Sequence, residues 1–269
     1  MDRWLKFLVV ASLLGLSGGY IQAEDEDEVE QEESKLSVDD KDLKALSDAK
    51  VGKSEESLVK AAARILGVDS KNLTALNTLG VFYFEQGKYG LARIILNRAV
   101  LAHPDVAAVH NNLGIILLAE NKQRLALAEF RKALEIKSDY RVAAANLGSI
   151  FLEYKDFERA LSPLEAGYKA TRSELKSGSS TAVEVANNYA VALTGIGKYS
   201  AAEDIYREIV ASSTRNPMVL INFAILLVEK LKNYKEGAKL ISKIKFAVDD
   251  PKVTKRLEEL EEQVSAGDK

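Results

Sequence analysis

Few side chains in this sequence could carry out catalytic chemistry. Its 269 residues include two histidines, His103 and His110, and no cysteine. The lack of cysteine excludes disulfides, thiolate metal sites and cysteine nucleophiles. A zinc site needs more converging ligands than two histidines provide, and no acid–base or nucleophile constellation accompanies them. We therefore expect a protein that is not an enzyme and that uses no cofactor and no metal.

A row of asparagines is the more informative set of polar side chains. Asparagine carries both hydrogen-bond donors and an acceptor, so it can hold one peptide unit of an extended chain at both ends. A row of such residues would hold main chain without reading its sequence. The alternative is that these amides are buried and satisfied by the protein's own groups. The row consists of Asn112, Asn146, Asn188 and Asn222.

An internal repeat positions these asparagines. Glycines recur every 34 residues, and an alanine stands 12 residues after each of them. A third column of small residues follows 7 positions later, and two further copies keep the column types with drifting offsets. The first three copies contain Gly80, Gly114 and Gly148, then Ala92, Ala126 and Ala160, then Ala99, Ala133 and Gly167; the last two contain Ala190 with Ala202, and Ala224 with Gly237.

Each copy has the pattern of two helices joined by a tight turn. Leu76, Leu79, Gly80 and Tyr83 have the i, i+3, i+4, i+7 spacing of one helical face. A second apolar face follows, and Gly87 between the two is suited to ending a helix. We expect the small residues to let the two helix backbones approach closely. The fifth copy has one extra residue, which we expect in its turn.

In repeat length and column chemistry the chain resembles the tetratricopeptide repeat. The resemblance implies an all-α fold, a right-handed superhelical solenoid of antiparallel helix pairs in which the first helix of each pair, helix A, lines the concave side. It also implies that asparagine is a common occupant of its column, which weakens the peptide-binding interpretation. The expected repeats are 73–106, 107–140, 141–174, 183–216 and 217–250, with a degenerate helix pair at 39–72 and a capping helix and tail at 251–269.

The same face of each helix A carries apolar residues beside the asparagine row. We expect it to form a groove that binds a peptide or helix of a protein partner, although neighbouring A helices could instead bury these side chains against one another. The apolar candidates are Val81, Phe84, Ile115, Leu118, Val191 and Ile225. At one edge of the groove stand Glu85, Glu153 and Glu229, which would favour a basic partner.

The N-terminus has the features of an export signal. A basic start, the apolar run Phe7–Leu16 and a small residue at Ala23 predict a cleavable signal peptide over 1–23. The run is shorter than the roughly 20 residues that span a bilayer, and the alternative is an uncleaved anchor in the inner membrane. Eight carboxylates in Glu24–Glu33 predict a solvated acidic spacer over 24–38, or else an arm that docks on a basic partner.

These features together predict a periplasmic interaction protein. Beyond residue 33 the chain holds 35 basic and 31 acidic residues, which is far from the charge pattern of a nucleic-acid binder. We expect a scaffold or adaptor of the bacterial cell envelope that binds a protein partner, with no stable membrane insertion once the signal is cleaved. The last repeat is similar to tetratricopeptide proteins of gliding motility and related envelope complexes. The alternative is a periplasmic chaperone or assembly factor.

Overall fold

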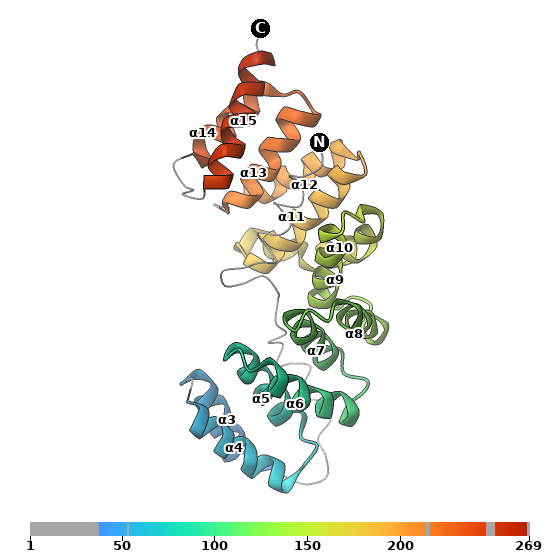
Figure 1. Cartoon of the computed structure of the whole chain (residues 1–269), viewed down its shortest axis with the longest axis vertical. Coiled ribbons are helices and arrows are strands. Elements are labelled where there is room, and N and C mark those ends of the chain that lie inside the picture. Colours follow the sequence, from blue (N-terminus) through green and yellow to red (C-terminus); the bar gives the residue numbers. More distant parts are fainter. Residues whose placement is uncertain (1–37, 53, 213–215, 246–250, 268–269) are drawn as a thin grey trace. The chain divides into compact units, whose positions relative to one another are not determined.

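The fold comes from a computed structural model that describes residues 38–52, 54–212, 216–245 and 251–267. The expected signal peptide and nearly all of the acidic spacer lie outside these residues. Within the described ranges the chain forms thirteen α-helices, two short helices of other types and no strand. The all-α class and the repeated helix pairs expected from the sequence are confirmed (Figure 1).

The described residues divide into two compact units, with the boundary after Ala143 inside one helix. The N-terminal unit holds α3 (Asp40–Val51), α4 (Glu55–Val68), α5 (Leu73–Glu85), α6 (Tyr89–Ala102), α7 (Ala107–Ala119), α8 (Gln123–Ile136) and the start of α9 (Arg141–Glu153). The C-terminal unit holds the rest of α9, α10 (Phe157–Thr171), η1 (Arg172–Ser177), α11 (Ser180–Gly195), α12 (Tyr199–Ala211), α13 (Pro217–Ile225), η2 (Leu226–Lys230), α14 (Tyr234–Ile244) and α15 (Pro251–Gly267).

The turn inside each of the five repeats has the same backbone geometry. One residue of each of these turns has a positive φ, between 57° and 80°, which ends helix A in the left-handed conformation. In the first repeat the amide of Gly87 donates to the carbonyl of Phe84, and the amide of Lys88 donates to that of Tyr83. The left-handed residues are Gly87, Asn121, Lys155, Gly197 and Lys232. Only the glycine at 87 was noted as a helix end from the sequence.

The glycine column makes room for a large side chain of the second helix, helix B. A Cβ atom on Gly80 would lie 2.5 Å from Cδ2 of Leu96, and one on Gly114 would lie 2.7 Å from Cε1 of Phe130. Gly148 stands in the same relation to Leu164. The expected close approach therefore exists, but it joins a helix A backbone to a helix B side chain rather than two backbones.

The extra residue of the fifth copy lies in a helix. The turn between η2 and α14 is three residues long, 231–233, and is therefore as long as the corresponding turn 86–88. The additional residue is instead taken up by the π-helical turn Leu226–Lys230, which continues α13. Our expectation of a longer turn was wrong, because a π-turn holds one more residue without changing the connection.

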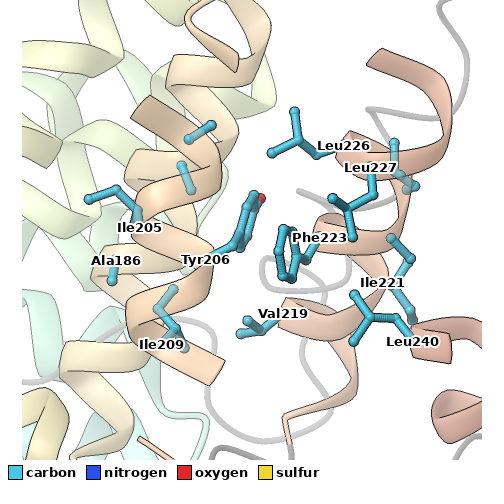
Figure 2. Close-up of a cluster of buried hydrophobic side chains, with 14 of the residues drawn as sticks. Ala186, Ile205, Tyr206, Ile209, Val219, Ile221, Phe223, Leu226, Leu227 and Leu240 are labelled. Atoms are coloured by element: carbon cyan, nitrogen blue, oxygen red, sulfur yellow. The ribbon is translucent and has the colours of Figure 1, made fainter. Parts of the chain in front are cut away.

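Stacked aromatic and aliphatic side chains form the core of the C-terminal unit (Figure 2). Tyr206 of α12 stacks on Phe223 of α13, with ring centroids 5.3 Å apart and planes inclined by 18°. Ile209 and Val219 are buried beside them, at 0% and 1% exposure. After this core, α15 contacts both α14 and η2, and its buried stripe contains Leu257 and Leu260.

Candidate peptide-binding site

The N-terminal unit contains a small apolar hollow between α5 and α7. Four of the residues proposed from the sequence line it, together with Leu96 and Ile116: Val81, Phe84, Asn112 and Ile115. The space between atoms amounts to about 180 Å³, but the interior has room for only about one water molecule. The α5/α7 hollow is therefore suited to the tip of one apolar side chain, and it is too small for a cofactor.

Asn112, which lines this hollow, belongs to a chain of hydrogen-bonded amides. Nδ2 of Asn112 on α7 donates to Oδ1 of Asn77 on α5 at 2.9 Å, and Nδ2 of Asn111 donates to Oδ1 of Asn112 at 3.2 Å. Asn112 is 3% exposed and Asn111 is fully buried. Because these bonds connect two successive A helices, the predicted binding residue also joins neighbouring repeats.

A similar chain of amides runs through the A helices of the C-terminal unit. Nδ2 of Asn222 on α13 donates to Oδ1 of Asn187 on α11 at 2.9 Å, and Nδ2 of Asn187 donates to Oδ1 of Asn188 at 3.3 Å. Nδ2 of Asn188 then donates to Oγ of Ser149 on α9 at 3.0 Å. We call these bonds, with their counterparts in the N-terminal unit, the amide ladder. Ser149 takes part because position 145 is alanine where repeats one, two and four have an asparagine.

The ladder leaves one buried acceptor unused. Asn222 is 5% exposed, and its Oδ1 has no hydrogen-bond partner among the described residues. In repeats two and four the preceding asparagine, Asn111 or Asn187, donates to this oxygen. In repeat five the preceding residue is Ile221, which has no donor. An apolar residue at that position therefore accounts for the unpaired atom.

The remaining proposed residues also lie on A helices and are largely buried. Asn146 is 2% exposed, and Asn188 is half-buried. Leu118, Val191 and Ile225 are between 7% and 9% exposed. Neighbouring helices therefore cover most of this face, as the alternative from the sequence had it. Half-buried Phe84, whose ring centroid lies 5.6 Å from that of Tyr89, is the most accessible apolar member.

Two carboxylates on A helices of the C-terminal unit lack a compensating charge. Burial alone raises the pKa of Glu153 at the end of α9, and likewise the pKa of Glu184 on α11. Glu184 precedes Asn188 and Val191 at i, i+4 and i+7, so it shares their helix face. Sequence reasoning missed Glu184, although that spacing could have indicated it.

The other two carboxylates of the predicted acidic edge differ from Glu153. Glu85 is exposed, whereas Glu229 forms an ion pair with Arg256 of α15, with Nη2 2.5 Å from Oε1. The acidic edge is therefore already neutralised by the chain itself at its last repeat. A basic partner would meet free carboxylates only at the earlier positions.

Both histidines have structural partners. Nδ1 of buried His110 lies 2.7 Å from Oε2 of Glu129, and its Nε2 lies 3.0 Å from the carbonyl oxygen of Pro104. Nε2 of His103 lies 2.6 Å from the carbonyl oxygen of Lys71. Each histidine thus connects one helix pair to a neighbouring segment. Across the described ranges, no group of three or more metal-ligating side chains converges.

Helix pairs that follow one another along the chain define a helical-repeat fold. Residues 72–139 match the family model of the tetratricopeptide repeat. This part of the chain consists of tetratricopeptide repeats, as its sequence indicated. Proteins of this family are interaction scaffolds and are generally non-catalytic. No helix in the described part of the chain is both long and apolar enough to span a bilayer.

Two curated relatives are bacterial proteins. The lipoprotein NlpI homolog of Haemophilus influenzae is 33% identical over 95 residues, which cover 35% of this chain and 30% of that protein. The type IV pilus assembly protein PilF of Pseudomonas aeruginosa is 26% identical over 152 residues, or 56% of this chain and 58% of that protein. The chain thus matches about a third of the first relative's length and somewhat over half of the second's.

Solved structures show the same fold. The structure of P. aeruginosa PilF has a TM-score of 0.58 at 21% identity, covering 72% of this chain and 88% of that one. YrrB, described as a tetratricopeptide-repeat protein with an unusual peptide-binding site, has a TM-score of 0.60 at 12% identity, covering 74% and 98%. At these identities the similarity establishes the fold alone.

Proposed function

We propose that the chain is a non-catalytic scaffold or adaptor of the bacterial cell envelope that binds a segment of a protein partner on its A-helix face. The α5/α7 hollow carries this proposal, because it gathers Val81, Phe84, Asn112 and Ile115 from two helices around one opening. The amide ladder supports it by fixing the spacing of those helices, so that the opening exists before a partner arrives.

The mode of binding follows from the size of the hollow. One apolar side chain of the partner enters between Val81 and Ile115, and the ring of Phe84 covers it. Most Nδ2 donors of the ladder already form hydrogen bonds within the protein. The partner's main chain can therefore bind only to lone pairs that remain on the Oδ1 acceptors. Affinity then depends more on apolar contact than on the asparagine row emphasised by the sequence.

Site-specific photocrosslinking in intact cells tests this proposal. A photoreactive phenylalanine analogue at position 84 should give a discrete crosslinked partner, identified by mass spectrometry. The control position is Leu125, which lies on α8 with 56% exposure and outside the hollow. Equal products from both positions, or none at 84 with a product at 125, would place the binding surface elsewhere.

The place of action is proposed from the N-terminal sequence and the relatives. Residues 1–23 have the pattern of a signal peptide, and the names of two relatives refer to a lipoprotein and to pilus assembly. We infer export to the periplasm and a place in a motility or envelope machine. The intact mass of protein from a periplasmic extract should correspond to a chain that begins at Glu24. A mass that includes residues 1–23 in the membrane fraction would instead support an uncleaved anchor.

An assembly factor is the second candidate, supported by the name of PilF. A scaffold should co-purify with one partner at a fixed ratio. An assembly factor should release its clients, so its complexes should be short-lived and varied. Pulse-chase after crosslinking at position 84 separates the two, because a product that decays within minutes fits release and a stable one fits the scaffold.

A further inference from the structure

A row of lysines covers the exposed face of α14. Lys235, Lys239 and Lys243 follow one another at intervals of four residues, and Lys232 precedes them in the turn. All four side chains are exposed. We call this set the lysine face. Helix geometry places its three helical members about 6 Å apart along the axis.

Among the described residues no carboxylate forms an ion pair with these lysines, although the charge of Lys239 contributes to lowering the pKa of Glu236. Within the described residues none of the four has an ion pair or a side-chain hydrogen bond. Glu236 is the carboxylate nearest to them in sequence, and it binds Arg207 of α12 through two bonds of 2.8 Å. That ion pair, with a hydrogen bond from Asn233, holds the pKa of Glu236 below its usual range.

The other B helices of the same unit balance their cations. On α10, Lys169 pairs with Glu165 at 2.7 Å and Arg159 pairs with Asp156 at 2.6 Å. On α12, Arg207 pairs with Glu203 at 2.6 Å as well as with Glu236. The lysine face differs because its i, i+4 neighbours repel one another, which weakens a helix. Lys235 also lies in the first turn, where the helix dipole disfavours a cation.

The chain carries a segment of matching charge and spacing. Glu24–Glu33 contains eight carboxylates and no basic residue. Glutamates occupy every second position of it, at 24, 26, 28, 30 and 32. Alternate side chains of an extended chain share a face and stand about 6.6 Å apart. That interval is close to the axial spacing of the lysines.

We propose that the lysine face of α14 binds the acidic segment Glu24–Glu33 of a second copy of this chain. In this contact the carboxylates of the segment pair with the lysines of α14. This contact links one copy to the next, head to tail. The contact does not involve the α5/α7 hollow, so an experiment can refute either proposal without affecting the other.

Zero-length crosslinking tests this contact, because a carbodiimide joins a carboxylate to an amine only when the two already touch. The purified chain, with and without ¹⁵N label, is mixed in equal amounts, crosslinked and digested. We expect peptides that join Lys235, Lys239 or Lys243 to Glu24–Glu33, and we expect label-mixed products among them. Deleting Glu24–Glu33 should abolish these products and leave the melting temperature of the dilute protein unchanged.

Paired charge reversals provide the controls. Lys235→Glu with Lys239→Glu should weaken self-association, measured by sedimentation equilibrium at low salt, by about tenfold or more. Lys44→Glu with Lys60→Glu changes the net charge equally at exposed positions of α3 and α4, and should leave association unchanged. Addition of 0.5 M salt should dissociate the unmodified chain, because exposed ion pairs are screened.

Three results would overturn the proposal. Crosslinks found only within one isotope label would mean that the segment binds its own copy. Equal weakening by both pairs of reversals would reduce the effect to net charge. Vesicles containing anionic lipid that bind the unmodified chain but not the Lys235 and Lys239 variant, without any self-association in solution, would assign the lysine face to a membrane surface.

Discussion

The amides of the A helices form a chain of hydrogen bonds within each unit. The position of each side chain therefore depends on its neighbour in that chain. Asn112 donates to Asn77 and accepts from Asn111, which means that one substitution affects three side chains. A buried amide that loses its partner pays the cost of desolvation without compensation. Substitutions at neighbouring positions of the amide ladder should therefore have strongly coupled effects on the free energy of unfolding.

A double-mutant cycle measures that coupling. Asn112→Ala should lower the free energy of unfolding by about 1–3 kcal/mol, because Oδ1 of Asn77 and Nδ2 of Asn111 lose their partner. Asn77→Ala alone should also destabilise, by leaving Nδ2 of Asn112 without its acceptor. The double variant should lose less than the sum, by about 0.5–3 kcal/mol. Urea unfolding gives these values, and simple additivity would show that the bond between the two amides contributes nothing.

Glu184 provides a pH-dependent test at the same scale. Burial raises its pKa in the folded state, so the charged form is disfavoured there. Its contribution to stability is present below the unfolded pKa and is lost as the pH rises through the folded pKa. Glu184→Gln should therefore raise the melting temperature at pH 7 and change it little near pH 3.5. Glu158→Gln, at an exposed position of α10, is the control and should show no such difference; an equal gain at both pH values would contradict the pKa argument.

At the scale of helices, the sequence predicted the packing within one repeat. It did not predict the contacts between neighbouring repeats. The glycine and alanine columns predicted helix pairs correctly, because their packing involves residues 16 apart in the same pair, such as Gly114 and Phe130. The amide ladder joins residues 35 or 39 apart, and which amides meet depends on how successive pairs stack. Composition also gave no sign of the left-handed turn residues Lys155 and Lys232, because lysine rarely adopts that conformation.

The candidate site was predicted in part. Four of the six residues that line the α5/α7 hollow were named from helical spacing, and the structure brings them together. The sequence left open whether these side chains are buried, because their burial depends on contacts between α5 and α7 of neighbouring repeats. Binding at the hollow and at the other named positions stays a prediction.

The glycine column makes a prediction about helix pairing. Gly114→Ala adds a Cβ that would lie 2.7 Å from Phe130, so α7 and α8 must move apart or the ring must shift. We expect a loss of about 1–3 kcal/mol from overpacking, despite a helix-propensity gain of up to about 1 kcal/mol. Gly90→Ala is the matched control, since no atom lies within 4 Å of its added Cβ, and it should stabilise slightly. Two variants with equal unfolding midpoints in urea would refute the close-contact account.

Over the whole chain, stability is divided between two compact units. Repeat proteins gain stability from each pair and from its contacts with adjacent pairs, so a local change acts mainly near its site. The N-terminal unit depends on packing such as Gly114 on Phe130, and the C-terminal unit on Tyr206 against Phe223. The two units should consequently respond separately to substitutions, although one chain contains both.

Native-state hydrogen exchange with two opposite variants tests this separation. Gly114→Ala should speed exchange of the most protected amides in α5–α8 about tenfold or more, while amides of α11–α14 change little. Gly237→Ala should do the reverse, because its Cβ would lie 2.4 Å from Cγ2 of Val228 in the C-terminal unit. The difference arises because each collision is relieved by opening only the helices that pack on it. Equal acceleration in both units by either variant would mean that the chain unfolds as one cooperative structure.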